Sequence, residues 1–88
     1  MKTKPTTARS PNRIWQAIKR SRYSQREVAR LLGYRTASNI SRWQNGSKLP
    51  TLAHAIGLSV ALSTNVDALF PEIRRRWAER INPRREKI

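Results

Sequence analysis

The chain has 88 residues, which is enough for one domain with a modest hydrophobic core. It has no cysteine, and its one histidine, His54, has no cluster of partners, so we expect no disulfide, metal or cofactor. Nineteen Lys and Arg against five Asp and Glu give a net charge of +14, which favours a polyanionic partner, most commonly nucleic acid.

Charge and apolar content divide the chain into three segments. Residues 1–9 are expected to form a flexible basic arm that contacts DNA through Lys2, Lys4 and Arg9. Residues 10–70 carry most of the apolar side chains and should fold, and residues 71–88 should form a basic C-terminal helix and tail. There is no apolar run of about 18–20 residues and no secretory signal, so we expect a cytoplasmic, nucleoid-associated protein without a membrane partner.

The first helix is predicted to begin at Ser10 and Pro11, because Ser caps helices and Pro suits the first helical position. Its apolar face should consist of Ile14, Trp15 and Ile18, and it should end near residue 21. We expect Trp15 to belong to the core, although an exposed aromatic ring could instead stack on single-stranded nucleic acid.

The second helix is predicted over 25–32. Ser24 and Glu27 have the spacing of a capping box, and Gly33 can end the helix in the left-handed conformation. A short turn then leads to a third helix over 37–44, with Thr36 as its expected cap and Gly46 at its end. Two helices joined by a short turn containing Gly are typical of a helix-turn-helix.

The third predicted helix has two unlike faces. Ala37, Ile40 and Trp43 fall on an apolar side that should pack on the core, which we favour over base stacking for Trp43. The opposite side is polar and free of acidic residues, and such a surface can enter a major groove. Arg42 can pair with guanine and Asn39 with adenine. The expected base-contacting residues are Ala37, Ser38, Asn39, Ser41 and Arg42.

A fourth helix is predicted to open at Pro50-Thr51, and a short fifth helix should place Leu69 and Phe70 on the core. Gly57, inside the fourth helix, indicates that another element packs closely there. The expected apolar positions of the fourth helix are Leu52, Ala55, Ile56, Val60 and Leu62. No alternating strand pattern occurs, so the predicted fold class is all-α.

A sixth helix is predicted over 72–81, ending at Asn82-Pro83, with residues 84–88 frayed. Ile73, Trp77 and Ile81 form an apolar stripe, which could close the core of the monomer or meet a second copy; we favour the core, with a dimer contact at its edge. The expected ion pairs are Glu72–Arg76 and Arg75–Glu79.

The residues from the second to the fourth helix resemble the Cro/lambda-repressor-like helix-turn-helix family, also called the XRE family. The resemblance covers about residues 14–70 and is carried by Ser24-Gln25, Val28-Ala29, Gly33, Ile40-Ser41, Trp43, Asn45-Gly46 and Pro50. It implies a five-helix domain, here with an extra C-terminal helix, in which the third helix reads bases and the second crosses the DNA backbone. Gln44 stands where many members of the family carry Glu.

Residues around the third helix are expected to bind phosphate. The resemblance places Gln25 and Asn45 at phosphate-contacting positions, and Gln25 has no evident local role that would explain it otherwise. Arg35 and Lys48 flank the helix. The expected backbone-contacting residues are Ser24, Gln25, Arg35, Thr36, Asn45 and Lys48.

The sequence thus predicts a regulator, most simply a repressor, that binds double-stranded DNA as a homodimer on an inverted repeat. One alternative is an antitoxin that uses the same DNA-binding domain and holds a toxin or another protein through the tail helix. A basic structural or membrane-surface protein is a further alternative. An enzyme is not expected, because no catalytic acid–base pair, cysteine nucleophile or phosphate loop is present in the sequence.

Overall fold

The computed structural model describes residues 12–88, and within them it contains helices and no strand, which confirms the all-α class. The expected arm and the Ser10-Pro11 helix start lie outside the described residues. The helices of this part of the chain are α1 (Ile14–Arg20), α2 (Gln25–Leu31), α3 (Ser38–Asn45), α4 (Leu52–Leu62), α5 (Val66–Leu69) and α6 (Pro71–Arg85).

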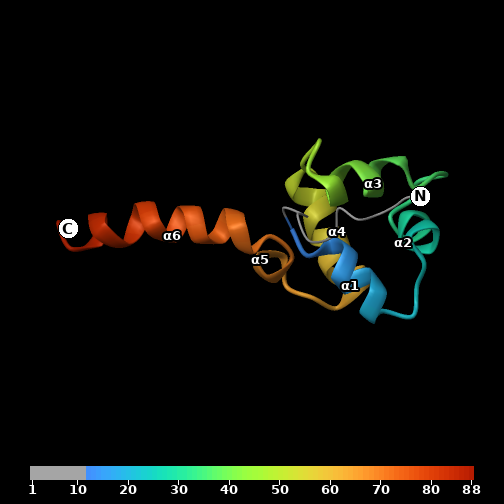
Figure 1. Cartoon of the computed structure of the whole chain (residues 1–88), viewed down its shortest axis with the longest axis horizontal. Coiled ribbons are helices and arrows are strands. Elements are labelled where there is room, and N and C mark those ends of the chain that lie inside the picture. The colour runs from blue at the N-terminus through green and yellow to red at the C-terminus, as the bar shows by residue number, and fades with distance from the viewer. Residues whose placement is uncertain (1–11) are drawn as a thin grey trace.

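The molecule consists of a globular body and one projecting helix. Helices α1 to α5 pack together, and α6 extends away from them, so the overall dimensions are 48 × 27 × 21 Å (Figure 1). The largest fully buried side chains come one from each helix of the body: Ile14, Val28, Ile40, Leu58 and Leu69. The core is therefore complete before α6 begins.

Asn12 is the one buried polar residue in the described part of the chain. Its side-chain oxygen accepts a hydrogen bond from the backbone N–H of Ile14 at 3.0 Å, and its Nδ2 donates to the carbonyl of Trp43 at 2.7 Å. The entry to α1 is thus fastened to α3, because each polar atom of the buried amide has a partner. The sequence analysis missed this role of Asn12.

The signals at the ends of α2 are confirmed. The hydroxyl of Ser24 accepts from the backbone N–H of Glu27, and the Glu27 carboxylate accepts from the N–H of Ser24, which completes the capping box. Gly33 has a φ of +91°, a conformation that glycine adopts without the steric penalty of a Cβ. The helix ends at Leu31, one residue earlier than expected.

Helix α3 is displaced by one residue from its predicted bounds. It begins at Ser38, after Ala37, which offers no capping side chain. The expected cap at Thr36 is wrong, because its hydroxyl bonds to the hydroxyl and backbone N–H of Ser38, at 3.1 and 3.4 Å. Gly46 closes the helix in the left-handed conformation, as predicted.

Helix α4 buries only two of its five predicted apolar positions, Ala55 and Leu62. Leu52, Ile56 and Val60 are exposed, at 75%, 49% and 74%, whereas Ala55, Leu58 and Leu62 are buried. The reason is that apolar residues occur around most of α4, so periodicity alone does not select a face. The packing of α4 against α2 and α5 selects the face that is buried. The close approach at Gly57 is confirmed, since a Cβ there would lie 2.7 Å from Cδ2 of Leu32.

Of the two tryptophans expected in the core, only Trp43 is there, at 3% exposure. Trp15 is half-buried, and the ammonium of Lys19 lies 5.0 Å from its ring centroid. Ile14 and Ile18 on the same helix are buried, and they suffice to anchor α1. Core residence was therefore the wrong prediction for Trp15.

Helix α6 departs most from expectation. It passes Asn82-Pro83 and runs through Arg84 to Arg85, so the predicted stop is wrong. Pro83 lacks the N–H that would bond to the carbonyl four residues earlier, but on an exposed helix water can satisfy that carbonyl. Glu72 pairs with Arg75 instead of Arg76, and Arg75 also pairs with Glu79.

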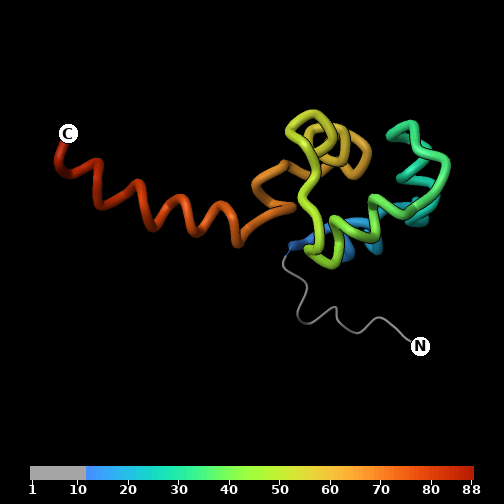
Figure 2. The backbone as a smooth tube through the Cα atoms, turned by 90° about the horizontal axis from the view of Figure 1, so that it is seen from above, coloured from blue at the N-terminus to red at the C-terminus, as the bar shows by residue number. Residues whose placement is uncertain are grey.

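The apolar stripe of α6 does not close the core. Ile73 packs against the body, but Trp77 is 52% and Ile81 39% exposed, and no residue of α6 is buried. A 15-residue helix that leaves the body after Phe70 carries its later turns out of reach of the core (Figure 2). The packing that we favoured for this stripe is therefore wrong beyond Ile73, and its contact with a second copy remains a prediction.

Candidate nucleic-acid interface

Helix α3 lies at the surface of the body with one face held in the core. Ile40 is fully buried and Trp43 is 3% exposed, whereas Ser38, Ser41 and Arg42 on the other side are exposed. The turn on either side of the helix is also exposed. The helix therefore presents a short polar surface on a rigid support.

Trp43 is fixed by rings from two other elements. Its ring centroid lies 6.0 Å from that of Tyr34 in the turn before α3 and 5.7 Å from that of His54 on α4. The Tyr34 hydroxyl lies 3.0 Å from Nε2 of His54, and the Thr51 hydroxyl lies 3.0 Å from its Nδ1. His54 is thus a hydrogen-bonded residue at the edge of the core, and it helps to hold α3 in place.

The expected base-contacting residues differ in how exposed they are. Ser38, Ser41 and Arg42 are exposed, but Asn39 is half-buried and Ala37 packs partly against the core. The Arg42 side chain forms no ion pair among residues 12–88. Its backbone carbonyl accepts from the N–H of Lys48 at 3.3 Å, which fixes the turn after α3. Arg42 is therefore the longest donor on the accessible face.

Ser24 and Gln25, two of the expected backbone-contacting residues, have partners that fix the start of α2. The hydroxyl of Ser24 serves the capping box. Nε2 of Gln25 donates to Oε1 of Gln44 at 3.0 Å, so the expectation that Gln25 lacks a local role is wrong. This bond joins the first residue of α2 to the last turn of α3. It sets the position of one helix against the other and holds Gln25 beside the candidate interface.

The remaining backbone-contacting candidates lie in the turns at the two ends of α3. Arg35 and Thr36 precede the helix and are exposed. Asn45 ends it, and its side-chain oxygen accepts from the N–H of Ser47 at 2.9 Å, while Lys48 follows in the same exposed turn. The structure therefore places all of these residues around α3. The arm residues Lys2, Lys4 and Arg9 lie outside the described residues.

The charge around α3 has one sign. No Asp or Glu occurs between Glu27 and Asp67, a stretch that includes α3 and both of its flanking turns. Arg35, Arg42 and Lys48 supply the positive charge there. Apart from Glu27, whose carboxylate is engaged in the capping box beside Gln25, the residues of this surface are cationic or neutral, so the surface attracts phosphate.

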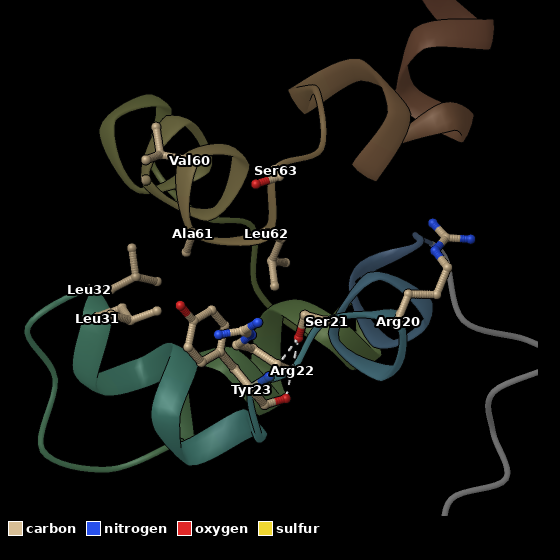
Figure 3. Close-up of a pocket in the computed structure, with 11 residues that line it drawn as sticks. Arg20, Ser21, Arg22, Tyr23, Leu31, Leu32, Val60, Ala61, Leu62 and Ser63 are labelled. Carbon is tan, nitrogen blue, oxygen red and sulfur yellow. Dashed lines mark hydrogen bonds between the residues drawn. The ribbon is translucent and has the colours of Figure 1, made fainter.

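An open groove of about 800 Å³ lies elsewhere on the body, between the α1–α2 connection, the end of α2 and the end of α4. Tyr23 lies in it beside Leu31, and Arg20 and Arg22 line it on the side of α1 (Figure 3). Its lining contains no carboxylate, histidine or cysteine, so it offers no acid–base pair. Within residues 12–88, no group of three or more His, Cys, Asp or Glu could hold a metal.

Compared with protein-family models, with curated proteins and with solved structures, the chain matches none of them. Among residues 12–88, no helix combines the length and the apolar character needed to cross a bilayer. The argument about function therefore depends on the surface around α3 and on the charge.

Proposed function

We propose that the chain is a sequence-specific double-stranded DNA-binding protein with a Cro/lambda-repressor-like helix-turn-helix domain. In this proposal α2 and α3 form the motif, and α3 enters the major groove with Arg42, Ser38 and Ser41 toward the base edges. Gln25 and the residues of the flanking turns bind the phosphates, which fixes the register of α3 along the duplex.

The observation that carries the proposal is the contrast between the two faces of α3. Ile40 and Trp43 are buried, and the opposite face is exposed, made of short polar side chains and one arginine, and free of acidic residues. Short side chains let the helix backbone approach the groove, and the guanidinium of Arg42 can reach the O6 and N7 atoms of a guanine. The net charge of +14 supplies the attraction to the polyanion.

As a regulator, the protein would bind as a homodimer on an inverted repeat. The two copies of α3 would then lie in successive major grooves, about 34 Å apart along one side of the DNA. A dimer of this size covers enough of a promoter to block it by occupancy, so repression is the proposed mode of regulation.

Selection of bound duplexes from a random DNA pool tests the proposal. We expect enrichment of a palindrome whose half-sites are centred about 10 base pairs apart. Arg20→Ala serves as a control, because Arg20 is an exposed cation at the end of α1 that carries no expected base contact. It should return the same palindrome, whereas Arg42→Ala should lose one position of each half-site. A pool that shows no enrichment with the unaltered protein contradicts the proposal.

The exposed part of α6 favours a second function, that of an antitoxin. Trp77 and Ile81 are apolar side chains with no partner in the body, and a toxin with a hydrophobic groove could bind them. Binding of a toxin encoded beside this chain, measured with the unaltered protein and with Trp77→Ala, tests it. Equal affinity of the two proteins for that toxin would exclude this use of α6.

A further inference from the structure

Helix α6 carries a row of arginines that form no ion pair within the described chain. Arg76, Arg80 and Arg84 follow one another at intervals of four residues, so they lie on one side of the helix, about 6 Å apart along its axis. All three are exposed, and none forms an ion pair within residues 12–88. Arg80 lies over the ring of Trp77, at 5.5 Å from the ring centroid, which keeps its charge accessible.

The acidic residues of α6 stand beside this row but pair with another arginine. Glu72 lies one turn before Arg76, yet Glu72 and Glu79 both bind Arg75, and they raise the pKa of its guanidinium through hydrogen bonds and charge. The remaining pair at this end of the chain joins Arg74 to Asp67 of α5, at 3.4 Å. Within residues 12–88, the carboxylates of α6 therefore leave Arg76, Arg80 and Arg84 without an ion pair.

A second copy of the chain is a poor partner for the arginine row. The chain has five acidic residues in all. Glu27 belongs to the capping box of α2, Asp67 pairs with Arg74, and Glu72 and Glu79 pair with Arg75. Only Glu86 remains, so another copy presents no acidic surface that could neutralise three arginines.

A lipid surface is also a poor partner. An interfacial helix buries a broad apolar face, about 100° wide or more. Beyond Ile73, which packs on the body, the helical part of α6 offers only Trp77 and Ile81 as large apolar side chains, and arginines occupy the positions around them. The row instead matches a partner with negative charges at regular intervals and no apolar surface to bury.

The position of α6 connects it to the candidate interface. In both views, the C-terminal end of α3 faces the side of the body from which α6 leaves (Figures 1 and 2). That end of the candidate interface and α6 therefore lie on the same side of the body. We propose that α6 is a second DNA-binding element, whose Arg76, Arg80 and Arg84 bind the phosphate backbone flanking the half-site. This inference rests on the proposed DNA-binding function.

The test compares two variants with equal loss of charge on the same helix. In the first, Arg76, Arg80 and Arg84 are all replaced by Gln, a good helix former. In the control, Gln replaces the arginines that lie outside the row, namely Arg74, Arg75 and Arg85. Circular dichroism establishes that both variants retain the helix content of the unaltered protein. Affinity for a selected duplex is then measured between 50 and 200 mM salt.

The row variant should lose three phosphate contacts, each of which contributes about 0.9 to the slope of log affinity against log salt. Its slope should be shallower by about 2.7. The unaltered protein should therefore lose about 40-fold more affinity than the row variant over this fourfold change in salt. The control variant should keep a slope close to that of the unaltered protein.

Duplex length gives a second readout. Fifteen helical residues span about 22 Å, which corresponds to about six or seven base pairs. Lengthening the duplex by seven base pairs on each side should tighten binding of the unaltered protein and not of the row variant.

The outcomes separate the two proposals. If the unaltered protein does not bind duplex DNA in a salt-dependent manner, the proposed function and this inference both fail. If it binds a selected site and the row variant keeps its salt slope, only the inference about α6 is overturned, even if α6 then binds anionic vesicles. Equal losses in both variants would show a general charge effect and would also overturn the inference.

Discussion

The body and α6 are both helical, but they are stabilised in different ways. Each helix from α1 to α5 buries at least one side chain in a shared core, whereas α6 buries none and has its polar contacts within itself or at its junction with α5. Helices of the first kind persist because packing holds them, and helices of the second kind depend on local propensity and ion pairs. Apolar residues at the same helical spacing are therefore buried in the body but mostly exposed on α6.

The largest expected effect concerns the body. Trp43→Ala removes a ring that is 3% exposed and contacts both Tyr34 and His54. We expect the free energy of unfolding to fall by about 3–5 kcal/mol, because a large cavity opens beneath α3. Thermal or urea denaturation measures it. A loss below about 1 kcal/mol would contradict the packing of α3 described above.

Arg42→Ala should leave the fold intact, since the side chain is exposed, but it should cost about 1–3 kcal/mol of binding to the selected site. Affinities for all single-base variants of the site, at two salt concentrations, are the measurement. A base contact relaxes the preference at one position per half-site. An unchanged rank order of variants would show that Arg42 binds phosphate only and that Ser38, Asn39 and DNA shape carry specificity.

Gln25→Ala should weaken binding to every DNA sequence alike, by about 1 kcal/mol, because phosphate contacts carry no base information. The bond to Gln44 adds a second consequence, since its loss frees the start of α2 from the end of α3. Gln44→Ala breaks that bond and keeps Gln25, so the two variants separate phosphate contact from helix positioning. A changed base preference in Gln25→Ala would contradict the phosphate role.

Ser24→Ala removes the capping box at the start of α2 and should cost about 1 kcal/mol of stability. No corresponding cap can be removed from α6, because Phe70 at its N-terminus offers no capping side chain. Thermal denaturation measures the effect, and Ser24→Asp is the control, since Asp also caps helices well. Equal losses for both substitutions would assign the effect to something other than the cap.

The smallest expected effect is that of Trp77→Ala. Its loss of stability can be compared directly with that of Trp43→Ala, because the same side chain is removed from α6 and from the body. Because Trp77 is 52% exposed, the free energy of unfolding should change by less than about 0.5 kcal/mol. Sedimentation should also be unchanged if α6 binds DNA. A shift of a dimer toward monomer would instead assign the stripe of Trp77 and Ile81 to contact between two copies.

Much of the body could be predicted from sequence because its signals are local. The capping box at Ser24 and the left-handed Gly33 and Gly46 depend on a few neighbouring residues, and the structure reproduces them. The face of α4 could not be predicted, because Leu52, Ile56 and Val60 are as apolar as the residues that are buried. Which side faces the core is decided by packing against α5, which follows after a short connection, and against α2, from which α3 and its flanking turns separate it in sequence.

The candidate site shows the same limit. The exposure of Ser38, Ser41 and Arg42 follows from the helical period, once Ile40 and Trp43 are assigned to the core. The pairing of Gln25 with Gln44 and the buried Asn12 do not follow, because each needs the relative position of two elements. A buried amide that joins residues 31 positions apart leaves no periodic signal in the sequence.

The hydrogen bond from Asn12 to Trp43 has a consequence for whatever precedes it in the chain. It fixes the attachment point of residues 1–11 beside the last turns of α3, and eleven residues reach at most about 40 Å. Because the same amide also accepts from the N–H of Ile14, one side chain joins the point where those residues meet the body, the start of α1 and the last turns of α3.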